Sequence, residues 1–204
     1  MISAQEALTR LRQGNQRFVS GTTQIDIRAR QQTLASLTDG QEPFAIILGC
    51  SDSRVPAEMI FDQDLGDLFV VRVAGNIVTP SQLGSIEFAA EKFGSKLVVV
   101  LGHSSCGAIS ATLDSLKHPG AGASEGIRTL VESISPSVQP LMGVVSDPTT
   151  LVQKAIRANI RNSVEQLQHG SATLQKLAES DLRIVGAEYS LQTGNVDFFG
   201  ADIT

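Results

Sequence analysis

The chain contains no tryptophan, one tyrosine and only two cysteines among its 204 residues, and aromatic residues make up 4%. Two cysteines cannot build the disulfide framework that stabilises small secreted domains, so a reducing compartment fits best. No apolar run approaches the roughly 20 residues of a membrane-spanning helix. Basic residues are scattered and the net charge is −5. These absences argue against nucleic acid or a membrane as a partner.

The composition is that of one soluble globular domain, with 42% apolar and 18% charged residues. A chain of this length buries roughly 70% of its unfolded surface, so it does not need a metal merely to fold. Residues 1–20 lack the cationic stretch and apolar core of a secretory signal. We therefore expect a cytoplasmic protein, or a periplasmic one if a leader has been removed.

Apolar patterning predicts an α/β fold, with a mostly parallel β-sheet flanked by helices, an N-terminal helical arm and a C-terminal β-hairpin. Continuous apolar runs bounded by turn residues indicate buried strands, and helical spacing with capping residues indicates helices. The predicted strands are 44–48, 68–73, 96–101, 182–191 and 196–199, and the predicted helices are 1–20, 29–37, 85–93, one beginning near Cys106, and 148–169. Between them, residues 117–146 are rich in Gly, Ser and Pro, with a short helical piece predicted at 127–134.

Two short motifs follow the ends of predicted strands, namely Cys50-Ser-Asp52-Ser-Arg54 and His103-Ser-Ser-Cys106. Ligands bind at the carboxyl ends of strands in open α/β sheets. Zinc is held by thiolate sulfur and imidazole nitrogen, and a catalytic zinc keeps a fourth position open beside three protein ligands. Cys50, His103 and Cys106 therefore form a candidate catalytic zinc site.

Less specific interpretations of the same residues remain open. A buried cysteine is often an inert small hydrophobe, and two cysteines can also act as a redox pair. Asp52 and Arg54 could form an exposed ion pair of little energetic weight. The glycines of the 102–107 segment have the spacing of a phosphate loop, but that loop requires a lysine where Ala108 stands. His118 and His169 lie in polar surroundings and receive no role.

The motifs resemble those of the β-class carbonic anhydrases. The likeness extends to Phe69-Val-Val-Arg-Val-Ala-Gly-Asn76, to Gly84-Ser-Ile-Glu-Phe-Ala89 and to the strand that leads into Gly102-His103, so it covers roughly residues 40–115 strongly and the flanks loosely. On this basis we divide the single domain, 1–204, into N-terminal helices (1–40), a zinc-site core (41–115), a surface excursion (116–147) and a C-terminal helix and hairpin (148–204).

The resemblance implies that Cys50, His103 and Cys106 bind one Zn²⁺, and that the carboxylate of Asp52 either binds zinc as well or pairs with Arg54. Two thiolates already neutralise the zinc, so a bound carboxylate should close the site. With Asp52 held by Arg54, a zinc-bound hydroxide can attack carbon dioxide and yield bicarbonate and a proton. The thiolates should weaken the zinc as a Lewis acid, so we expect activity to rise on the alkaline side.

The resemblance also implies a small substrate pocket formed by Gln41, Phe69, Ala74, Phe88 and Gly107. Phe88 is a departure from plant members, which carry a tyrosine there. One bacterial branch, inhibited by bicarbonate, carries a tryptophan three residues before the first cysteine. Here that position is Ile47; Arg72 matches the arginine of that inhibitory site, but its neighbours do not complete it. We therefore expect Asp52 to pair with Arg54 near neutral pH.

Family resemblance further implies self-association as a homodimer or tetramer, with the N-terminal helix as a plausible arm, although packing on its own domain is an equally ordinary outcome. Two other functions compete with carbon dioxide hydration. One is hydrolysis of carbonyl sulfide or carbon disulfide on the same scaffold. The other is a non-catalytic zinc or redox-sensing protein, which predicts a closed four-ligand site or loss of zinc on mild oxidation.

Overall fold

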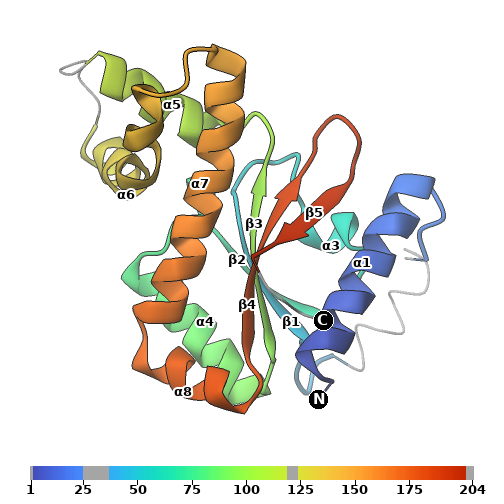
Figure 1. Cartoon of the computed structure of the whole chain (residues 1–204). Helices are drawn as coiled ribbons and strands as arrows, with labels where there is room; N and C mark the ends of the chain where they lie inside the picture. Colours follow the sequence, from blue (N-terminus) through green and yellow to red (C-terminus); the bar gives the residue numbers. More distant parts are fainter. Residues whose placement is uncertain (1, 25–36, 119–123, 201–204) are drawn as a thin grey trace.

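The computed structural model describes residues 2–24, 37–118 and 124–200. Its strands form one sheet in the order β2-β1-β3-β4-β5, in which all neighbours are parallel except the β4–β5 pair (Figure 1). The strands are β1 (Ala45–Gly49), β2 (Leu68–Arg72), β3 (Leu97–His103), β4 (Arg183–Tyr189) and β5 (Val196–Phe199). The predicted mostly parallel sheet and C-terminal hairpin are confirmed.

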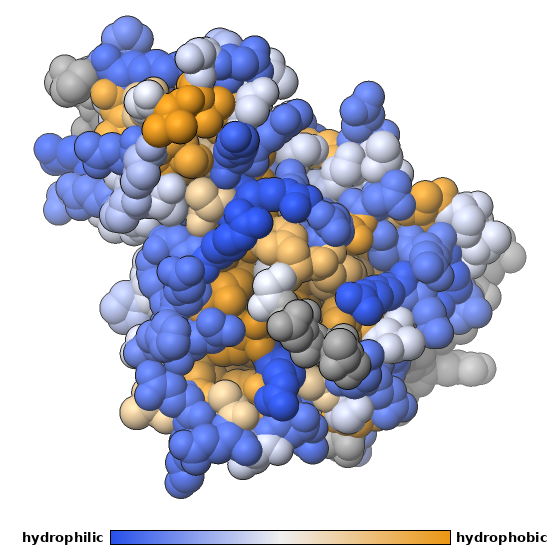
Figure 2. All heavy atoms as spheres, in the orientation of Figure 1, coloured by the Kyte–Doolittle hydropathy of each residue, from blue (hydrophilic) through white to orange (hydrophobic). Residues whose placement is uncertain are grey.

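Helices cover both faces of the sheet, which explains why β1 and β3 are continuous apolar runs buried at every position. One face packs against α4 (Pro80–Phe93), α7 (Pro148–His169) and α8 (Ala172–Ser180). The other packs against α1 (Ala4–Ser20) and the short α3 (Ala57–Ile60) (Figure 1). Figure 2 shows mostly hydrophilic residues on the outer surface in this view, around a hollow where apolar residues are visible. None of the described helices is long and apolar enough to cross a membrane.

The N-terminal helix α1 forms as its capping residues predict. The Ser3 hydroxyl accepts a hydrogen bond from the Glu6 N–H at 3.1 Å, and Gly21 ends the helix with a φ of 70°. Leu8 and Leu11 are buried against the sheet of the same chain. The helix predicted at 29–37 falls largely on residues 25–36, which lie outside the described part of the chain.

The Gly-, Ser- and Pro-rich segment differs from its prediction. Instead of a short piece at 127–134, it contains the 18-residue helix α6 (Glu125–Met142), which includes Pro136 and Pro140. Ile134 and Val138 of this helix are fully buried, and α6 packs against α5 (Gly107–Lys117) and α7. The apolar residues at helical spacing gain enough from burial to outweigh the helix-breaking tendency of prolines on the exposed side.

Other boundaries shift in ways that affect the site. Helix α4 begins at Pro80 rather than at residue 85, and α8 was not predicted. The turn η1 (Ala74–Asn76) after β2 was not predicted either. His103 is the last residue of β3, paired with Tyr189 of β4, rather than a residue beyond the strand. The histidine side chain therefore projects from the sheet itself.

Candidate metal centre

Cys50, His103 and Cys106 meet at the carboxyl edge of the sheet. Cys50 follows β1, His103 ends β3 and Cys106 directly precedes α5. Their ligand atoms all lie within 4.8 Å of one another. All three side chains are buried, with His103 at 0% exposure. The three residues singled out from the sequence therefore form one compact group, of the kind that could hold a metal ion.

The imidazole of His103 is held in one orientation. Its Nδ1 lies 2.9 Å from the Ser104 carbonyl oxygen, so Nδ1–H is the donor and Nε2 carries the lone pair. Ser104 is itself fixed by β4, because its N–H donates to the Tyr189 carbonyl at 2.9 Å and its hydroxyl accepts from the Leu191 N–H at 2.9 Å. Within residues 2–24, 37–118 and 124–200, Nε2 has no hydrogen-bonding partner. A buried nitrogen left with its lone pair free fits a metal ligand.

The two thiols influence each other strongly. A hydrogen bond from Cys106 is the largest cause that lowers the pKa of Cys50, with burial opposing it and His103 and the Gly75 N–H adding to it. The same interaction, reinforced by burial, raises the pKa of Cys106. Burial is the largest influence on the pKa of His103 and lowers it, but the Cys50 sulfur, the Ser104 carbonyl and the Asp52 carboxylate together outweigh burial, and the net shift is upward. The pair therefore shares one negative charge more readily than two, until a cation arrives.

Backbone around Cys50 is fixed by the neighbouring strand and turn. The Gly75 N–H points at the Cys50 sulfur from 3.4 Å. Arg72, at the end of β2, donates from Nε to the Cys50 carbonyl at 2.9 Å and from a terminal nitrogen to the Asp52 carbonyl at 2.6 Å. Arg72 thus holds the loop that carries both motif residues. The sequence marked it only as a match to an inhibitory arginine.

Asp52 and Arg54 form a two-point ion pair beside the cluster. Arg54 donates from Nε to Oδ1 at 2.9 Å and from a terminal nitrogen to Oδ2 at 2.7 Å, and its backbone N–H donates to Oδ1 at 3.0 Å. The side-chain hydrogen bond with Arg54 is the largest cause that holds the pKa of Asp52 well below its usual range. Asp52 Oδ2 lies 3.9 Å from His103 Nε2. The carboxylate therefore stays charged near the cluster while Arg54 engages both oxygens.

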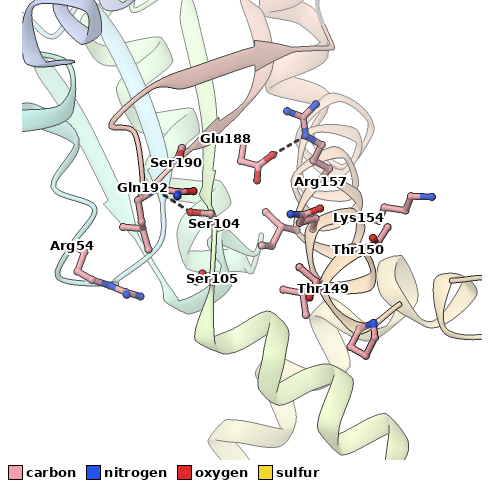
Figure 3. A pocket seen from close by; sticks show the side chains of 15 residues that line it. Arg54, Ser104, Ser105, Thr149, Thr150, Lys154, Arg157, Glu188, Ser190 and Gln192 are labelled. Atoms are coloured by element: carbon pink, nitrogen blue, oxygen red, sulfur yellow. Dashed lines mark hydrogen bonds and ion pairs between the residues drawn. The ribbon is translucent and has the colours of Figure 1, made fainter. Parts of the chain in front are cut away.

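A cleft of about 1080 Å³ opens next to this pair. Figure 3 shows Arg54, Ser104 and Ser105 on one side and Thr150 and the Arg157–Glu188 ion pair on the side of α7 and β4. Its lining is mixed and carries several charges, whereas a small apolar molecule favours an apolar pocket. Ser104 and Ser105 lie between His103 and Cys106 in the sequence, so the cleft borders the segment that carries two members of the cluster.

The predicted substrate residues fall into two groups, and none of them lines that cleft. Ala74 and Gly107 are adjacent in sequence to residues at the cluster, Gly75 and Cys106. Phe69 instead pairs with Ile46, three residue pairs or about 10 Å along the strand from the Gly49 end of β1.

The other two predicted substrate residues, Phe88 and Gln41, have neighbours outside the Cys50–His103–Cys106 group. Phe88 is 53% exposed and packs against Phe69 in a tilted arrangement, with 6.4 Å between ring centroids, and it meets Phe93 edge-on. Gln41 borders a separate surface hollow together with Phe93. The role of these five residues in binding substrate stays a prediction.

Fold and cluster together define an α/β protein with a buried Cys–His–Cys group at the sheet edge that could hold a metal ion. The family model described as carbonic anhydrase matches residues 45–196. A carbonic anhydrase of Mycolicibacterium smegmatis is 42% identical over 188 residues, which cover 92% of this chain and 89% of that protein. Carbonic anhydrase 2 of Mycobacterium tuberculosis is 42% identical over 185 residues, covering 90% and 87%.

Solved structures agree with these sequence relatives. The β-carbonic anhydrase CcaA is 26% identical with a TM-score of 0.72 and covers 95% of each chain. One of two tetrameric β-carbonic anhydrases of Sordaria macrospora, at 24% identity and a TM-score of 0.73, covers 85% of this chain and 90% of its own and shows the same fold. The chain belongs to the β-carbonic anhydrase family and is an enzyme of that family. This membership supports hydration of carbon dioxide as its reaction.

Proposed function

We propose that the chain catalyses the reversible hydration of carbon dioxide to bicarbonate and a proton, as a zinc lyase with one Zn²⁺ per chain. The observation that carries this proposal is the buried Cys50–His103–Cys106 group, whose ligand atoms lie within 4.8 Å of one another. Two sulfurs and one imidazole nitrogen are the donor set that zinc accepts, and three protein ligands leave the fourth position for water.

The residues fit zinc in detail. Nε2 of His103 has its lone pair free among the described residues, and the Ser104 carbonyl holds the opposite ring nitrogen. When bound, zinc would lower the pKa of a water molecule and so supply a nucleophile near neutral pH. Zinc would favour deprotonation of both thiols, and the two thiolate charges would balance the charge of the metal. The repulsion that otherwise disfavours two neighbouring thiolates would then be offset.

Asp52 would orient the attacking water and accept its hydrogen bond. The support is its position, 3.9 Å from His103 Nε2, and its low pKa, which keeps it an acceptor over the working pH range. Asp52 could also serve as a fourth metal ligand, and Arg54 opposes that posture by engaging both carboxylate oxygens. We infer that the form with Asp52 paired to Arg54 is the open, active one.

We propose that the chain works as a homodimer or tetramer. Phe88 supports this, because it is 53% exposed within an aromatic group that includes Phe69 and Phe93. The Sordaria relatives of the same fold are described as tetrameric. In such an assembly Gln41, Phe69 and Phe88 would complete a pocket with Ala74 and Gly107 of a neighbouring copy. We further propose a cytoplasmic location, in keeping with two unpaired cysteines.

Stopped-flow hydration of carbon dioxide by zinc-quantified protein tests the proposal directly. We expect fast turnover with one zinc per chain. Turnover absent despite stoichiometric zinc would overturn it, and the same sample should then be assayed with carbonyl sulfide and carbon disulfide. Zinc that is present without any turnover, and lost on mild oxidation, would instead support the sensing function.

A further inference from the structure

The turn η1 presents an N–H group to the metal centre in an unusual backbone conformation. Gly75 and Asn76 are consecutive residues with positive φ angles, 74° and 44°. Glycine adopts this region freely and asparagine is among the few other residues that tolerate it. In this conformation the Gly75 N–H lies 3.4 Å from the Cys50 sulfur. The turn therefore has a local energetic cost, and it delivers a hydrogen bond to a proposed ligand.

Two side chains of α7 hydrogen-bond to the carbonyls of this turn. Asn159 Nδ2 donates to the Gly75 carbonyl at 2.7 Å, and the Ser163 hydroxyl donates to the Asn76 carbonyl at 3.0 Å. The two are four residues apart and so lie on one face of the helix. Each is 1% exposed. The carbonyls of Gly75 and Asn76 are thus each fixed by a side chain of α7, a helix of 22 residues.

Side chains from two further helices pack closely around Gly75. A Cβ added at Gly75 would stand 2.9 Å from Ile134 Cδ1 and 3.2 Å from Ala108 Cβ. Ile134 belongs to α6 and Ala108 to α5, so three helices enclose the turn. Loss of the hydrogen bonds from α7 to these carbonyls should therefore change the orientation of the Gly75 N–H as well.

Burial of the amide of Asn159 is not favoured by packing alone. Its Oδ1, and Nδ2 of Asn76, are buried without a hydrogen-bonding partner among the described residues. An apolar side chain at position 159 would avoid burying an unpaired oxygen. The asparagine is therefore better explained by the hydrogen bond that it donates than by its contribution to the core.

We propose that Asn159, with Ser163, is a positioning residue that aims the Gly75 N–H at Cys50 and so limits how much electron density this sulfur gives to the metal. The inference rests on the proposed zinc site. A thiolate that accepts a hydrogen bond is a weaker donor, which keeps the metal a stronger Lewis acid. This partly offsets the effect of having two thiolate ligands.

The test uses cobalt-substituted full-length protein and compares Asn159→Leu with wild type. We expect the sulfur-to-cobalt charge-transfer band to move to longer wavelength, because the sulfur lone pair rises in energy when its hydrogen bond weakens. In the zinc form, kcat should fall about 10- to 100-fold with KM unchanged. Ser163→Ala should move both quantities in the same direction by less.

Asn15→Leu provides a matched control. Asn15 is another buried helical asparagine, 6% exposed, which donates to the carbonyls of Ile60 and Gly194 on the opposite face of the sheet. It should lower stability without moving the band. An unmoved band and unchanged kcat in Asn159→Leu would overturn the proposal. If Asn159→Leu does not fold, the same two measurements on Ser163→Ala decide. A wild type without any charge-transfer band would instead overturn the metal site itself.

Discussion

The proposed metal ligands and the Asp52–Arg54 pair lie side by side, with Asp52 Oδ2 3.9 Å from His103 Nε2, yet they are held in opposite ways. His103 is fully buried at the end of a central strand, and both its backbone and its ring are bonded to the chain. Arg54 has a 56% exposed side chain and Asp52 a 17% exposed one, and the two hold mainly each other. One part of the site is built not to move, and the other can rearrange at little cost.

Removing a fixed ligand should have the largest effect. Cys106→Ser replaces the sulfur that adjoins α5 and leaves two strong donors, which are too few for tight zinc binding. We expect zinc content to fall below one per chain and hydration activity to fall by more than about 100-fold, beyond what loss of an outer-shell partner costs. Metal analysis of the purified variant beside its stopped-flow rate checks this. Full zinc content with near-normal turnover would show that Cys106 is not a ligand.

Changing the carboxylate should separate chemistry from metal binding. Asp52→Asn keeps the shape of the side chain but weakens its role as acceptor. We expect hydration to fall by about 10²- to 10⁴-fold while one zinc per chain remains. If Asp52 were required to retain the metal, zinc and activity would disappear together. Asp52 would then belong with the fixed ligands and not with the movable ion pair.

The pH profile of the wild type should show how acidic the centre is. With Cys50 and Cys106 both bound as thiolates, the metal is a weaker Lewis acid than one held by three neutral histidines. Hydration should therefore rise from roughly pH 6.5 to roughly pH 9, where more of the water is activated. A rate that stays flat over this range contradicts the assignment of two thiolate ligands.

Loosening the pair should have the smallest effect on the fold and a visible effect on pH dependence. Arg54 lowers the pKa of Asp52, so the pair adds stability above the ordinary pKa of an aspartate and loses it only as the pH falls through the lowered value. Arg54→Ala should raise that pKa and free Asp52 to compete with water for the fourth metal position, and this competition should move the acid limb of the activity profile to higher pH. The thermal midpoint should barely change, because Arg54 is exposed.

Arg54→Lys is the matched variant for this last prediction. Lysine keeps the charge but cannot engage both carboxylate oxygens at once. Its acid limb should fall between those of the wild type and Arg54→Ala. Identical profiles for all three proteins would mean that Arg54 does not control Asp52.

The proximity of Cys50, His103 and Cys106 could be predicted because it depends on patterns within short stretches of sequence. Apolar runs marked the strands that end near Cys50 and His103, and parallel strands bring such ends to one edge. The α6 helix was predicted too short, because Pro136 and Pro140 suggest a loop and only tertiary contacts show Ile134 and Val138 to be core residues.

Residues that act through backbone groups could not be predicted in this way. Asn159 and Ser163 sit in an ordinary amphipathic helix, and nothing local shows that their partners are carbonyls some 84 and 87 residues earlier in the chain. Arg72 ends a strand like many exposed arginines, and its two carbonyl partners became visible only with the fold. Asn159 and Ser163 belong to no motif that the sequence analysis singled out.

Because His103 is the last residue of β3, this proposed metal ligand is anchored in the central part of the sheet. Its strand runs between β1 and β4, with every residue from Leu97 to His103 buried. Amide protons of such a strand exchange with deuterium through the highest-energy openings of a domain. The backbone amides of β3 should therefore be among the slowest to exchange, and the end of this strand together with the Ser104 carbonyl holds the imidazole of His103 in place. By contrast, the exposed side chain of Arg54 can part from Asp52 without any opening of the sheet.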